Sequence, residues 1–385
     1  MIRRVQISEP CIGEDEWRAL RGPIETGWLT QGPYVAEFER AFAQRHQVSH
    51  AVATTSCTTA LHLMLCAAGI GPGDEVILPS FTWLATANAV VYAGATPVLV
   101  DVEVDTYNIS IEDALRHVSS RTKAVIAVHL FGRCVDVPKL RESLPQGIRV
   151  FEDAACAAGA TWGQRSAGSL GHAATFSFHP RKSITTGEGG MLTTNEPDMA
   201  SRAERLRNHG ASLSDAQRHG GARPYDLPDF TELGFNYRMT DLQASVGLVQ
   251  LGKLDEFVSQ RDVGASVYEE GLSGVNVLQL PMRPLDGRHA WQSYVVRILG
   301  EDAHSKRQVI MQKLHEEEIA TRAGTLAVHS LGYYRDLLGK SDQQLPGSAI
   351  CRDATLAIPL HNRMSPDDYQ RVIDTLRGVI KSSRF

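Results

Sequence analysis

The first two-thirds of the chain alternate short apolar runs with stretches of helical periodicity. Residues 56–68 and 82–92 carry apolar side chains at helical spacing. The apolar runs around them are rich in valine and isoleucine without strict alternation, and they span residues 75–79, 96–101, 122–129, 148–153, 173–179 and 190–194. Strands of this kind are buried on both faces, as in parallel sheets covered by helices. The pattern therefore predicts an α/β fold with short connections.

The pattern changes near residue 253. A helical stretch covers residues 241–257, and glycines and prolines then separate shorter strands before two amphipathic helices predicted at 305–317 and 366–380. A chain of 385 residues exceeds one ordinary core. We therefore predict two domains, a large one over 1–253 and a smaller one over 254–385. Residues 211–230 are polar and lack a period, which is typical of a functional or disordered loop.

Composition and charge exclude several classes of protein. The chain is 43% apolar and 22% charged with a net charge of −5, and it has no basic stripe for nucleic acid. No apolar run approaches the roughly 20 residues of a membrane span. Six scattered cysteines without a CxxC pair predict reduced thiols in a cytoplasmic protein, with neither a disulfide framework nor a metal site. The motifs of Rossmann, P-loop, zinc-protease and lipase-like sites are absent.

Lys182 stands just past an apolar run, on a turn rich in serine, threonine and glycine. A lysine used for covalent chemistry needs a rigid position near a sheet edge and must be a free amine part of the time. The alternative is an ordinary solvent-exposed lysine. The position of Lys182 makes it a candidate nucleophile.

Asp153 ends the apolar run 148–153. A carboxylate there is costly to bury without a partner, and the protonated nitrogen of a pyridine ring is such a partner. The alternative is an aspartate that caps a helix over residues 154–158. A lysine and a buried carboxylate at neighbouring strand ends are what a pyridoxal phosphate site needs.

Two further features suit a phosphorylated, aromatic cofactor. The segment Thr54–Thr59 precedes a helical stretch, where free N–H groups and hydroxyls bind anions, and Ser177 could reach the same phosphate. Trp83 follows a strand at the edge where α/β proteins bind ligands, and its indole could stack on a pyridine ring. The alternatives are simple helix capping by the Ser/Thr cluster and a core or interface aromatic at Trp83.

Together these features resemble the DegT/DnrJ/StrS family of pyridoxal phosphate-dependent sugar aminotransferases. The resemblance covers nearly the whole chain from about Gly27, and it rests on the segments 27–33, 71–76, 94–98, 128–132, 152–155, 176–190, 207–210 and 234–241. It implies an aspartate-aminotransferase-like fold of type I. That fold has a large domain with a mixed, mostly parallel sheet and a smaller C-terminal α+β domain.

The resemblance also implies a role for each candidate residue. Lys182 would form the Schiff base with pyridoxal 5'-phosphate and shuttle protons, and Asp153 would pair with the pyridine nitrogen. The remaining implied contacts are Trp83 on the ring, Cys57, Thr58 and Ser177 on the phosphate, Asn236 on the phosphate of the partner subunit, Cys156 near the 3′-oxygen, and Thr30, Arg238 and His329 at the substrate entrance. Cys156 departs from the glutamine or histidine that the family usually has, and a thiol is a weaker hydrogen-bond partner.

The implied activity is transfer of an amino group to a keto-sugar nucleotide, with L-glutamate as donor, by a homodimer with shared active sites. A dehydrating branch of the family replaces the lysine with histidine, so Lys182 argues against it. A non-catalytic regulatory homologue should have lost Lys182 or Asp153, and both are present. A keto-cyclitol acceptor remains an alternative to the sugar nucleotide.

Overall fold

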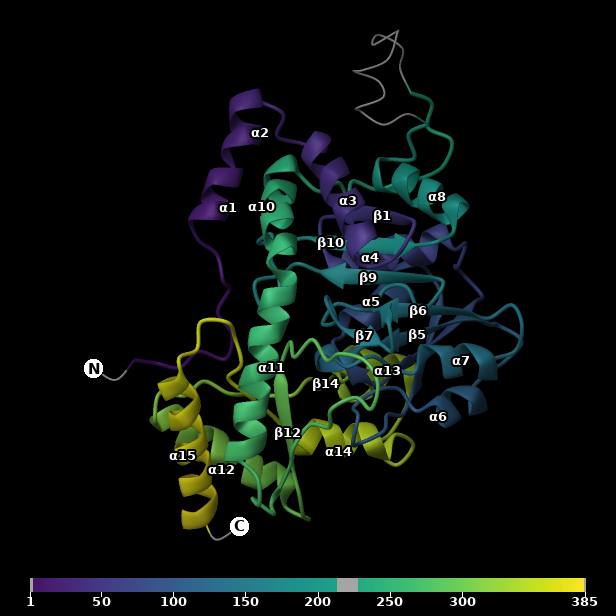
Figure 1. The fold of residues 1–385 in the computed structure, drawn as a ribbon. Helices are drawn as coiled ribbons and strands as arrows, with labels where there is room; N and C mark the ends of the chain where they lie inside the picture. Colours follow the sequence, from purple (N-terminus) through teal and green to yellow (C-terminus); the bar gives the residue numbers. More distant parts are fainter. Residues whose placement is uncertain (1–2, 213–227, 384–385) are drawn as a thin grey trace.

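The computed structural model describes residues 3–212 and 228–383 and contains two main sheets with helices packed around them (Figure 1). Part of the predicted loop 211–230 lies outside the described residues. The helices of the first two-thirds are α1 (Glu14–Ala19), α2 (Arg21–Thr26), α3 (Pro33–Arg45), α4 (Cys57–Ala67), α5 (Ala85–Tyr92), α6 (Ile111–Arg116), α7 (Val137–Ser143), α8 (Pro197–Arg207) and α10 (Asp241–Gly252). A short 3-10 turn spans Leu130–Gly132.

The large sheet has seven strands in the order β1-β10-β9-β6-β5-β2-β4. Its strands are β1 (His50–Thr54), β2 (Glu75–Pro79), β4 (Thr96–Val100), β5 (Thr122–Val128), β6 (Arg149–Asp153), β9 (Ala173–Ser177) and β10 (Gly190–Thr194). Strands β9, β6, β5, β2 and β4 run parallel, whereas β10 is antiparallel to both β9 and β1. This confirms the mixed, mostly parallel sheet. Strand β1 was not predicted, because its run contains a single branched apolar residue.

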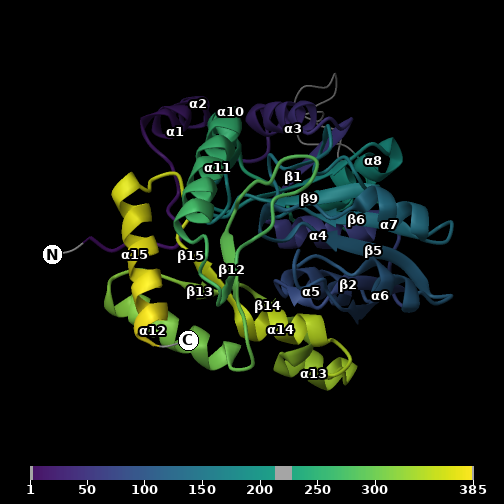
Figure 2. The same cartoon turned by 60° about the horizontal axis from the view of Figure 1, so that its bottom comes forward.

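Helices cover both faces of this sheet (Figures 1 and 2). A separate apolar core fills each side. Ile77 and Val150 point into the core under α3, α7 and α10. Leu78 and Phe151, their neighbours along the same strands, point into the core under α4, α5 and α8. Successive strand residues face opposite sides, so burial on both faces explains why the runs lack alternation.

The C-terminal third builds a second, antiparallel sheet in the order β11-β12-β15-β13. Its elements are α11 (Leu254–Gly271), β11 (Leu278–Gln279), β12 (Tyr294–Ile298), α12 (Ala303–Glu316), β13 (Arg322–Ala323), β14 (Leu326–Ala327), α13 (Gly332–Leu338), α14 (Pro346–Ala354), β15 (Thr355–Ile358) and α15 (Pro366–Ser382). The two predicted amphipathic helices are confirmed as α12 and α15. The predicted helix 241–257 is wrong in length, because α10 ends at Gly252 and α11 begins at Leu254.

The N-terminal segment lies against this second sheet rather than the first. Val5 exchanges backbone hydrogen bonds with Glu318 and Ala320, both at 2.9 Å. Its side chain packs in a third apolar core, which is built mainly by the C-terminal third of the chain. The chain start and α15 are neighbours in both views (Figures 1 and 2). The division at residue 253 stays a prediction, although the junction of α10 and α11 falls there. Within the described ranges, no helix has the length and apolarity to cross a bilayer.

The register of the large sheet places the ends of several strands side by side. Ser177 at the end of β9 lies opposite Gly190, and Gly190 lies opposite Thr54 at the end of β1. Asp153 at the end of β6 is paired with Val128 of β5. The carboxyl ends of parallel strands meet at one edge, which is where α/β sheets bind ligands. The candidate residues of the sequence therefore gather at this edge.

Candidate active site

Lys182 lies on a turn that its own backbone holds in place. Its N–H donates to the carbonyl of His179 at 2.8 Å, and the next residues return to β10 through the bond from Thr186 N–H to the Phe178 carbonyl at 3.0 Å. The Lys182 side chain is partly exposed, and Nζ donates to Cys156 Sγ at 3.2 Å. The lysine and cysteine that the sequence nominated are thus in direct contact.

Opposing influences act on the pKa of Lys182. Burial acts to lower the pKa of Lys182, but the Cys156 sulfur, the Cys57 sulfur and the Asp153 carboxylate raise it, and the net shift is upward. Around Cys57, burial acts in the opposite direction, because it disfavours the charged thiolate, whereas Lys182 lowers the pKa of the thiol. Burial and the Asp153 charge raise the pKa of the Cys57 thiol well above its usual range. These four residues therefore share one electrostatic environment at the sheet edge.

Asp153 is 5% exposed and is held by two donors. Thr86 on α5 donates its hydroxyl to Oδ2 at 2.7 Å, and the Ala155 N–H donates to Oδ1 at 3.1 Å. Residues 154–160 form turns rather than the helix considered as an alternative. A carboxylate with only two neutral donors can still accept a hydrogen bond from a cation. Because the carboxylate is buried, such a partner would offset the cost of removing its charge from water.

A second buried carboxylate stands beside Asp153. Glu152 is fully buried and accepts from the N–H groups of Gly168, Leu170 and Gly171 at 2.7–2.8 Å. It also faces His129 Nε2 at 2.8 Å, while His129 Nδ1 accepts from the Val135 N–H at 3.1 Å. The acceptor role of Nδ1 places the proton on Nε2, so His129 donates to Glu152. This network ties β5, β6 and the segment before β9 together next to Asp153.

The start of α4 supplies the anion-binding feature. Ser56 is the N-cap of α4 and accepts a hydrogen bond from the Thr59 N–H at 3.2 Å, so the Ser/Thr cluster does cap this helix. Cys57 and Thr58 occupy the first turn. First-turn N–H groups have no partner within a helix and attract anions. A Cβ at Gly190 would lie 2.4 Å from the Ser56 carbonyl carbon. Glycine at this position therefore lets the helix start approach β10, next to Ser177, which is 9% exposed.

Trp83 follows the short strand β3 (Phe81–Thr82) and is 59% exposed. Strand β3 pairs with β14, so the C-terminal third of the chain meets the strand-end edge here. A tryptophan this exposed is not a core residue, which leaves an interface aromatic as the alternative for it. Its ring is available for contact with a ligand or another subunit.

Asn236 and Arg238 lie on an extended segment between the end of β1 and the end of α8. The Thr55 N–H donates to the Tyr237 carbonyl at 3.0 Å, and the Tyr237 N–H donates to the Arg207 carbonyl at 3.0 Å. Arg238 pairs with Thr54 as an isolated bridge and donates to Asn208 Oδ1 at 2.8 Å. Asn236 is exposed. The structure therefore places both residues beside the start of α4, with the Asn236 side chain facing outward.

Thr30 is exposed and is anchored through its backbone. The Asp241 N–H lies 3.2 Å from the carbonyls of Leu29 and Thr30, and the Asp241 carboxylate accepts from N–H groups at the start of α3. Burial raises the pKa of Asp241, and those N–H groups lower it in part. Asp241 thus fixes the Thr30 segment to the start of α10.

His329 is 2% exposed, and both of its ring nitrogens are engaged. Nδ1 lies 2.7 Å from Ser80 Oγ and Nε2 lies 2.8 Å from Asp342 Oδ1. The Arg352 guanidinium, followed by His329, lowers the pKa of Asp342 to about 2. His329 is therefore a buried link between the C-terminal third and Ser80, which precedes β3, rather than a side chain open to the entrance.

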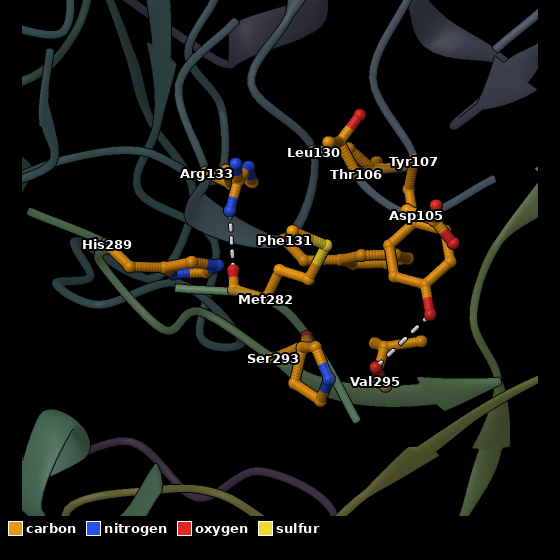
Figure 3. A pocket seen from close by; sticks show the side chains of 11 residues that line it. Asp105, Thr106, Tyr107, Leu130, Phe131, Arg133, Met282, His289, Ser293 and Val295 are labelled. Atoms are coloured by element: carbon orange, nitrogen blue, oxygen red, sulfur yellow. Dashed lines mark hydrogen bonds between the residues drawn. The ribbon is translucent and has the colours of Figure 1, made fainter. Parts of the chain in front are cut away.

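A separate pocket lies where the segment before β12 meets the large sheet (Figure 3). Arg133 donates to the Met282 carbonyl, and Tyr107 donates to the Val295 carbonyl at 3.5 Å. His289 is buried and stacks on Trp291 with 3.9 Å between ring centroids. None of the 11 lining residues is a predicted site residue. The pocket belongs to the contact between the two parts of the chain.

Three supporting groups escaped the sequence prediction. Thr86 is the single serine or threonine of α5 and stands three residues after Trp83, which is a signal that could have been read. The His129–Glu152 pair could not have been read as a pair, because nothing in the sequence shows that these strand ends are adjacent. Asp241 follows Thr240 and resembles an ordinary first-turn acid, so its long-range bonds to α3 gave no local signal.

The comparison with known proteins agrees with this geometry. The model of the DegT/DnrJ/EryC1/StrS aminotransferase family matches residues 10–377. The chain belongs to this family. It is 38% identical over 380 residues to the spore coat polysaccharide biosynthesis protein SpsC of Bacillus subtilis, covering 98% of this chain and 97% of that protein. It is 39% identical over 380 residues to the GDP-perosamine synthase of Caulobacter vibrioides, covering 98% of each.

Solved structures lead to the same family. The pyridoxal phosphate form of a putative sugar aminotransferase, Spr1654 of Streptococcus pneumoniae, superimposes with a TM-score of 0.91 at 27% identity over 99% of both chains. DesV of S. venezuelae, solved with a ketimine intermediate, gives a TM-score of 0.88 at 31% identity over 98% of both chains. The predictions of fold, enzyme class and cofactor are thereby confirmed: this family member is a pyridoxal phosphate-dependent aminotransferase of sugar metabolism.

Proposed function

We propose that the enzyme moves an amino group from L-glutamate to a keto group on a nucleotide-linked sugar, as a cytoplasmic homodimer with shared active sites. The similarity to a GDP-perosamine synthase supports a nucleotide-linked acceptor. All six cysteines are free thiols, which supports a reducing compartment. The observation that carries the proposal is the contact of Lys182 with Cys156 beside the buried Asp153, at the edge where α4 begins.

The residues at this edge fit pyridoxal phosphate in three respects. The first turn of α4, with Cys57, Thr58 and the nearby Ser177, would hold the phosphate. Gly190 supports this assignment, because any side chain there would displace the helix start. Asp153 would hold the ring nitrogen, since the carboxylate is buried and has neutral donors only. Trp83 would cover one face of the ring.

When bound, the cofactor supplies a carbonyl that exchanges amines and a ring that withdraws electrons. Asp153 would keep the ring nitrogen protonated, and Thr86 holds the carboxylate in position for that role. Lys182 Nζ would take the proton from the substrate carbon and return it in each half of the exchange. Cys156, in contact with Nζ, restrains the amine on the side of the turn at residues 154–160.

The path of segment 235–238 supports a site completed by a second subunit. Phe235 and Tyr237 stack on each other at 4.9 Å and both lie against His62 of α4. Alternate residues of an extended segment face opposite sides, so Asn236 points away from its own α4. An exposed asparagine held rigidly in this way is placed to reach the phosphate of a partner copy.

The substrate would enter past Thr30 and Arg238. Arg238 is the charged group nearest the start of α4 along segment 235–238, and its bond to Asn208 leaves further guanidinium donors for a diphosphate. His329 acts through Ser80 in this proposal, because its own nitrogens are occupied. Its role is to position β3 and hence Trp83.

The proposal is tested with a panel of acceptors. Purified enzyme with pyridoxal phosphate and L-glutamate is offered keto-sugar nucleotides, the corresponding free keto sugars and keto-cyclitols, and release of 2-oxoglutarate is measured. We expect turnover with a keto-sugar nucleotide, none with Lys182→Ala, and unchanged turnover with the exposed control Lys139→Ala. Turnover with keto-cyclitols alone would refute the nucleotide acceptor, and turnover that survives Lys182→Ala would refute the site.

A further inference from the structure

The contact between Lys182 and Cys156 joins two nucleophiles at hydrogen-bond distance. Nζ lies 3.2 Å from Sγ, and both side chains are partly exposed, so a small oxidant can reach them. Cys57, the other thiol of the site, is 8% exposed, and its Sγ lies 3.6 Å from Thr175 Oγ1. Cys156 is therefore the accessible thiol, and its nearest reactive neighbour is an amine rather than a second sulfur.

The backbones on both sides of this contact are held in place. A Cβ at Gly132 would lie 3.1 Å from the Cys156 carbonyl oxygen, so the turn bearing Cys156 is packed against the Gly132 backbone. The Lys182 turn is fixed by its own hydrogen bond to His179 and by Gln292, which donates to the Arg181 carbonyl at 3.0 Å. Only the flexible lysine side chain has to move for the two reactive atoms to meet.

We propose that Lys182 and Cys156 form a reversible covalent cross-link when the enzyme meets a peroxide while the Lys182 amine is free. The peroxide takes two electrons from Cys156 Sγ, its O–O bond breaks, one oxygen joins the sulfur as sulfenic acid and the other leaves as water. Nζ then attacks the sulfur, an N–S bond forms, and the S–O bond breaks. The departing hydroxyl takes a proton from the amine and leaves as a second water.

The charges at the site favour this order of events. The sulfur of Cys156 is among the groups that raise the pKa of Lys182, whereas burial lowers it. Conversion of the Cys156 sulfur to sulfenic acid removes one of these raising influences, while burial and the raising influences of Cys57 and Asp153 remain. The first step thereby shifts the pKa of Lys182 downward, toward the free amine that the second step needs.

Reduction restores both groups. An external thiol attacks the sulfur, the N–S bond breaks, and the amine takes a proton; a second thiol then frees Cys156 from the mixed disulfide. While the cross-link lasts, Lys182 cannot form a bond to an aldehyde. The cross-link depends only on the contact of the two side chains, so it goes beyond the proposed amino transfer and can be tested apart from it.

The test uses the full-length protein, treated with hydroxylamine and desalted so that the Lys182 amine is free, and then exposed to hydrogen peroxide. Tryptic digestion without reductant and mass spectrometry should show residues 150–165 joined to residues 182–202, at the sum of the two masses less two hydrogens. Dithiothreitol should separate the pair. Oxidation of Cys156 with Lys182 unmodified, or a disulfide between Cys156 and Cys57, would overturn the proposal.

Variants locate the bond. Cys11→Ser removes another partly exposed cysteine and should leave the cross-link intact. Cys156→Ser should abolish it. Lys182→Arg keeps the positive charge but should leave a persistent sulfenic acid at Cys156 that dimedone traps. A cross-linked product in Lys182→Arg would show that another amine is the partner and overturn the assignment.

A parallel sample receives pyridoxal phosphate before the peroxide, and its absorbance is recorded. A lower yield of cross-link than in the stripped sample supports a shared Lys182. An unchanged yield would leave the cross-link standing and refute Lys182 as the cofactor lysine. Binding of pyridoxal phosphate together with no cross-link in the stripped sample would refute the cross-link and leave the proposed function standing.

Discussion

The inner and outer parts of the site are built in different ways. We define the site floor as Cys57, Thr86, His129, Glu152 and Asp153, all at most 8% exposed. We define the outer rim as Thr30, Trp83, Asn236 and Arg238, which are exposed or half-buried. The floor is held by hydrogen bonds between side chains and strand ends, whereas the rim is anchored chiefly through backbone bonds.

This difference separates the chemistry from the choice of substrate. Buried polar groups are costly unless they are paired, so each change in the floor disturbs several neighbours. Rim side chains have few such constraints and can vary without loss of the fold. The floor therefore determines what the cofactor can do, and the rim determines what reaches it.

The largest expected effect comes from the charge of the floor. Asp153→Ala should lower kcat for amine transfer by about 10²–10³-fold or more, as typically follows loss of a preorganised charge or donor. The measurement is single-turnover reaction with L-glutamate, read by absorbance. The exposed Asp198→Ala is the matched control and should react as wild type. Near-normal kinetics in Asp153→Ala would mean that the ring nitrogen has another partner.

The second effect concerns the stability of the floor. Glu152→Gln keeps the size of the side chain but replaces one acceptor oxygen with a donor that faces N–H groups. Because Glu152 accepts four hydrogen bonds in a fully buried position, we expect about 3 kcal/mol less free energy of unfolding. Urea denaturation measures it. A loss below about 0.5 kcal/mol, the range of ordinary surface substitutions, would show that the network contributes little.

The rim should behave in the opposite way. Asn236→Ala should leave the urea midpoint within the range of surface substitutions, because Asn236 is exposed, yet lower kcat/KM by about tenfold, the loss of one good hydrogen bond to a charged group. Mixing it with Lys182→Ala subunits should restore activity in heterodimers that hold one intact shared site. Verified heterodimers with no higher kcat/KM per intact Lys182 than the Asn236→Ala homodimer would argue that Asn236 serves its own subunit.

The core beneath the floor adds a dependence on pH. His46 is fully buried, stacks on Phe42 with 4.0 Å between centroids, and has its pKa lowered by burial from 6.5 to about 3. Burial has the same effect on His289. Between these pH values only the unfolded chain binds the proton, so stability is lost as pH falls below 6.5, by about 1.4 kcal/mol per pH unit for each histidine.

The variant His46→Phe keeps a ring against Phe42 and removes the titration. Urea unfolding measured at several pH values below 6.5, but above the range where carboxylates titrate, should show a slope smaller by about one proton. His289 and the other histidines whose pKa burial lowers, left in place, supply the remaining slope. An unchanged slope in the variant would mean that His46 takes up its proton in the folded state.

The sequence predicted the floor and the rim unequally. Lys182, Asp153 and the start of α4 could be read because each stands where an apolar run ends or a helix begins. The pairing of His129 with Glu152 could not be assigned, since it depends on which strands are neighbours, whereas Thr86 could have been noticed beside Trp83. His329 was predicted at the entrance, but its ring nitrogens are taken by Ser80 and Asp342, which lie 249 and 13 residues away in the chain.

The smallest expected effect tests how the rim is attached to the rest of the site. Tyr237 Oη lies 3.0 Å from His62 Nδ1, and His62 Nε2 lies 3.4 Å from Cys66 Sγ, so segment 235–238 is tied to the flank of α4. Tyr237→Phe removes one hydrogen bond and keeps the stack on Phe235, which should cost about 1 kcal/mol of stability. If the rim is positioned by this tie, the variant should also raise KM for the acceptor without changing the half-reaction with L-glutamate. An equal loss of rate in both half-reactions would mean that the rim residues also position the floor, and the distinction between floor and rim would fail.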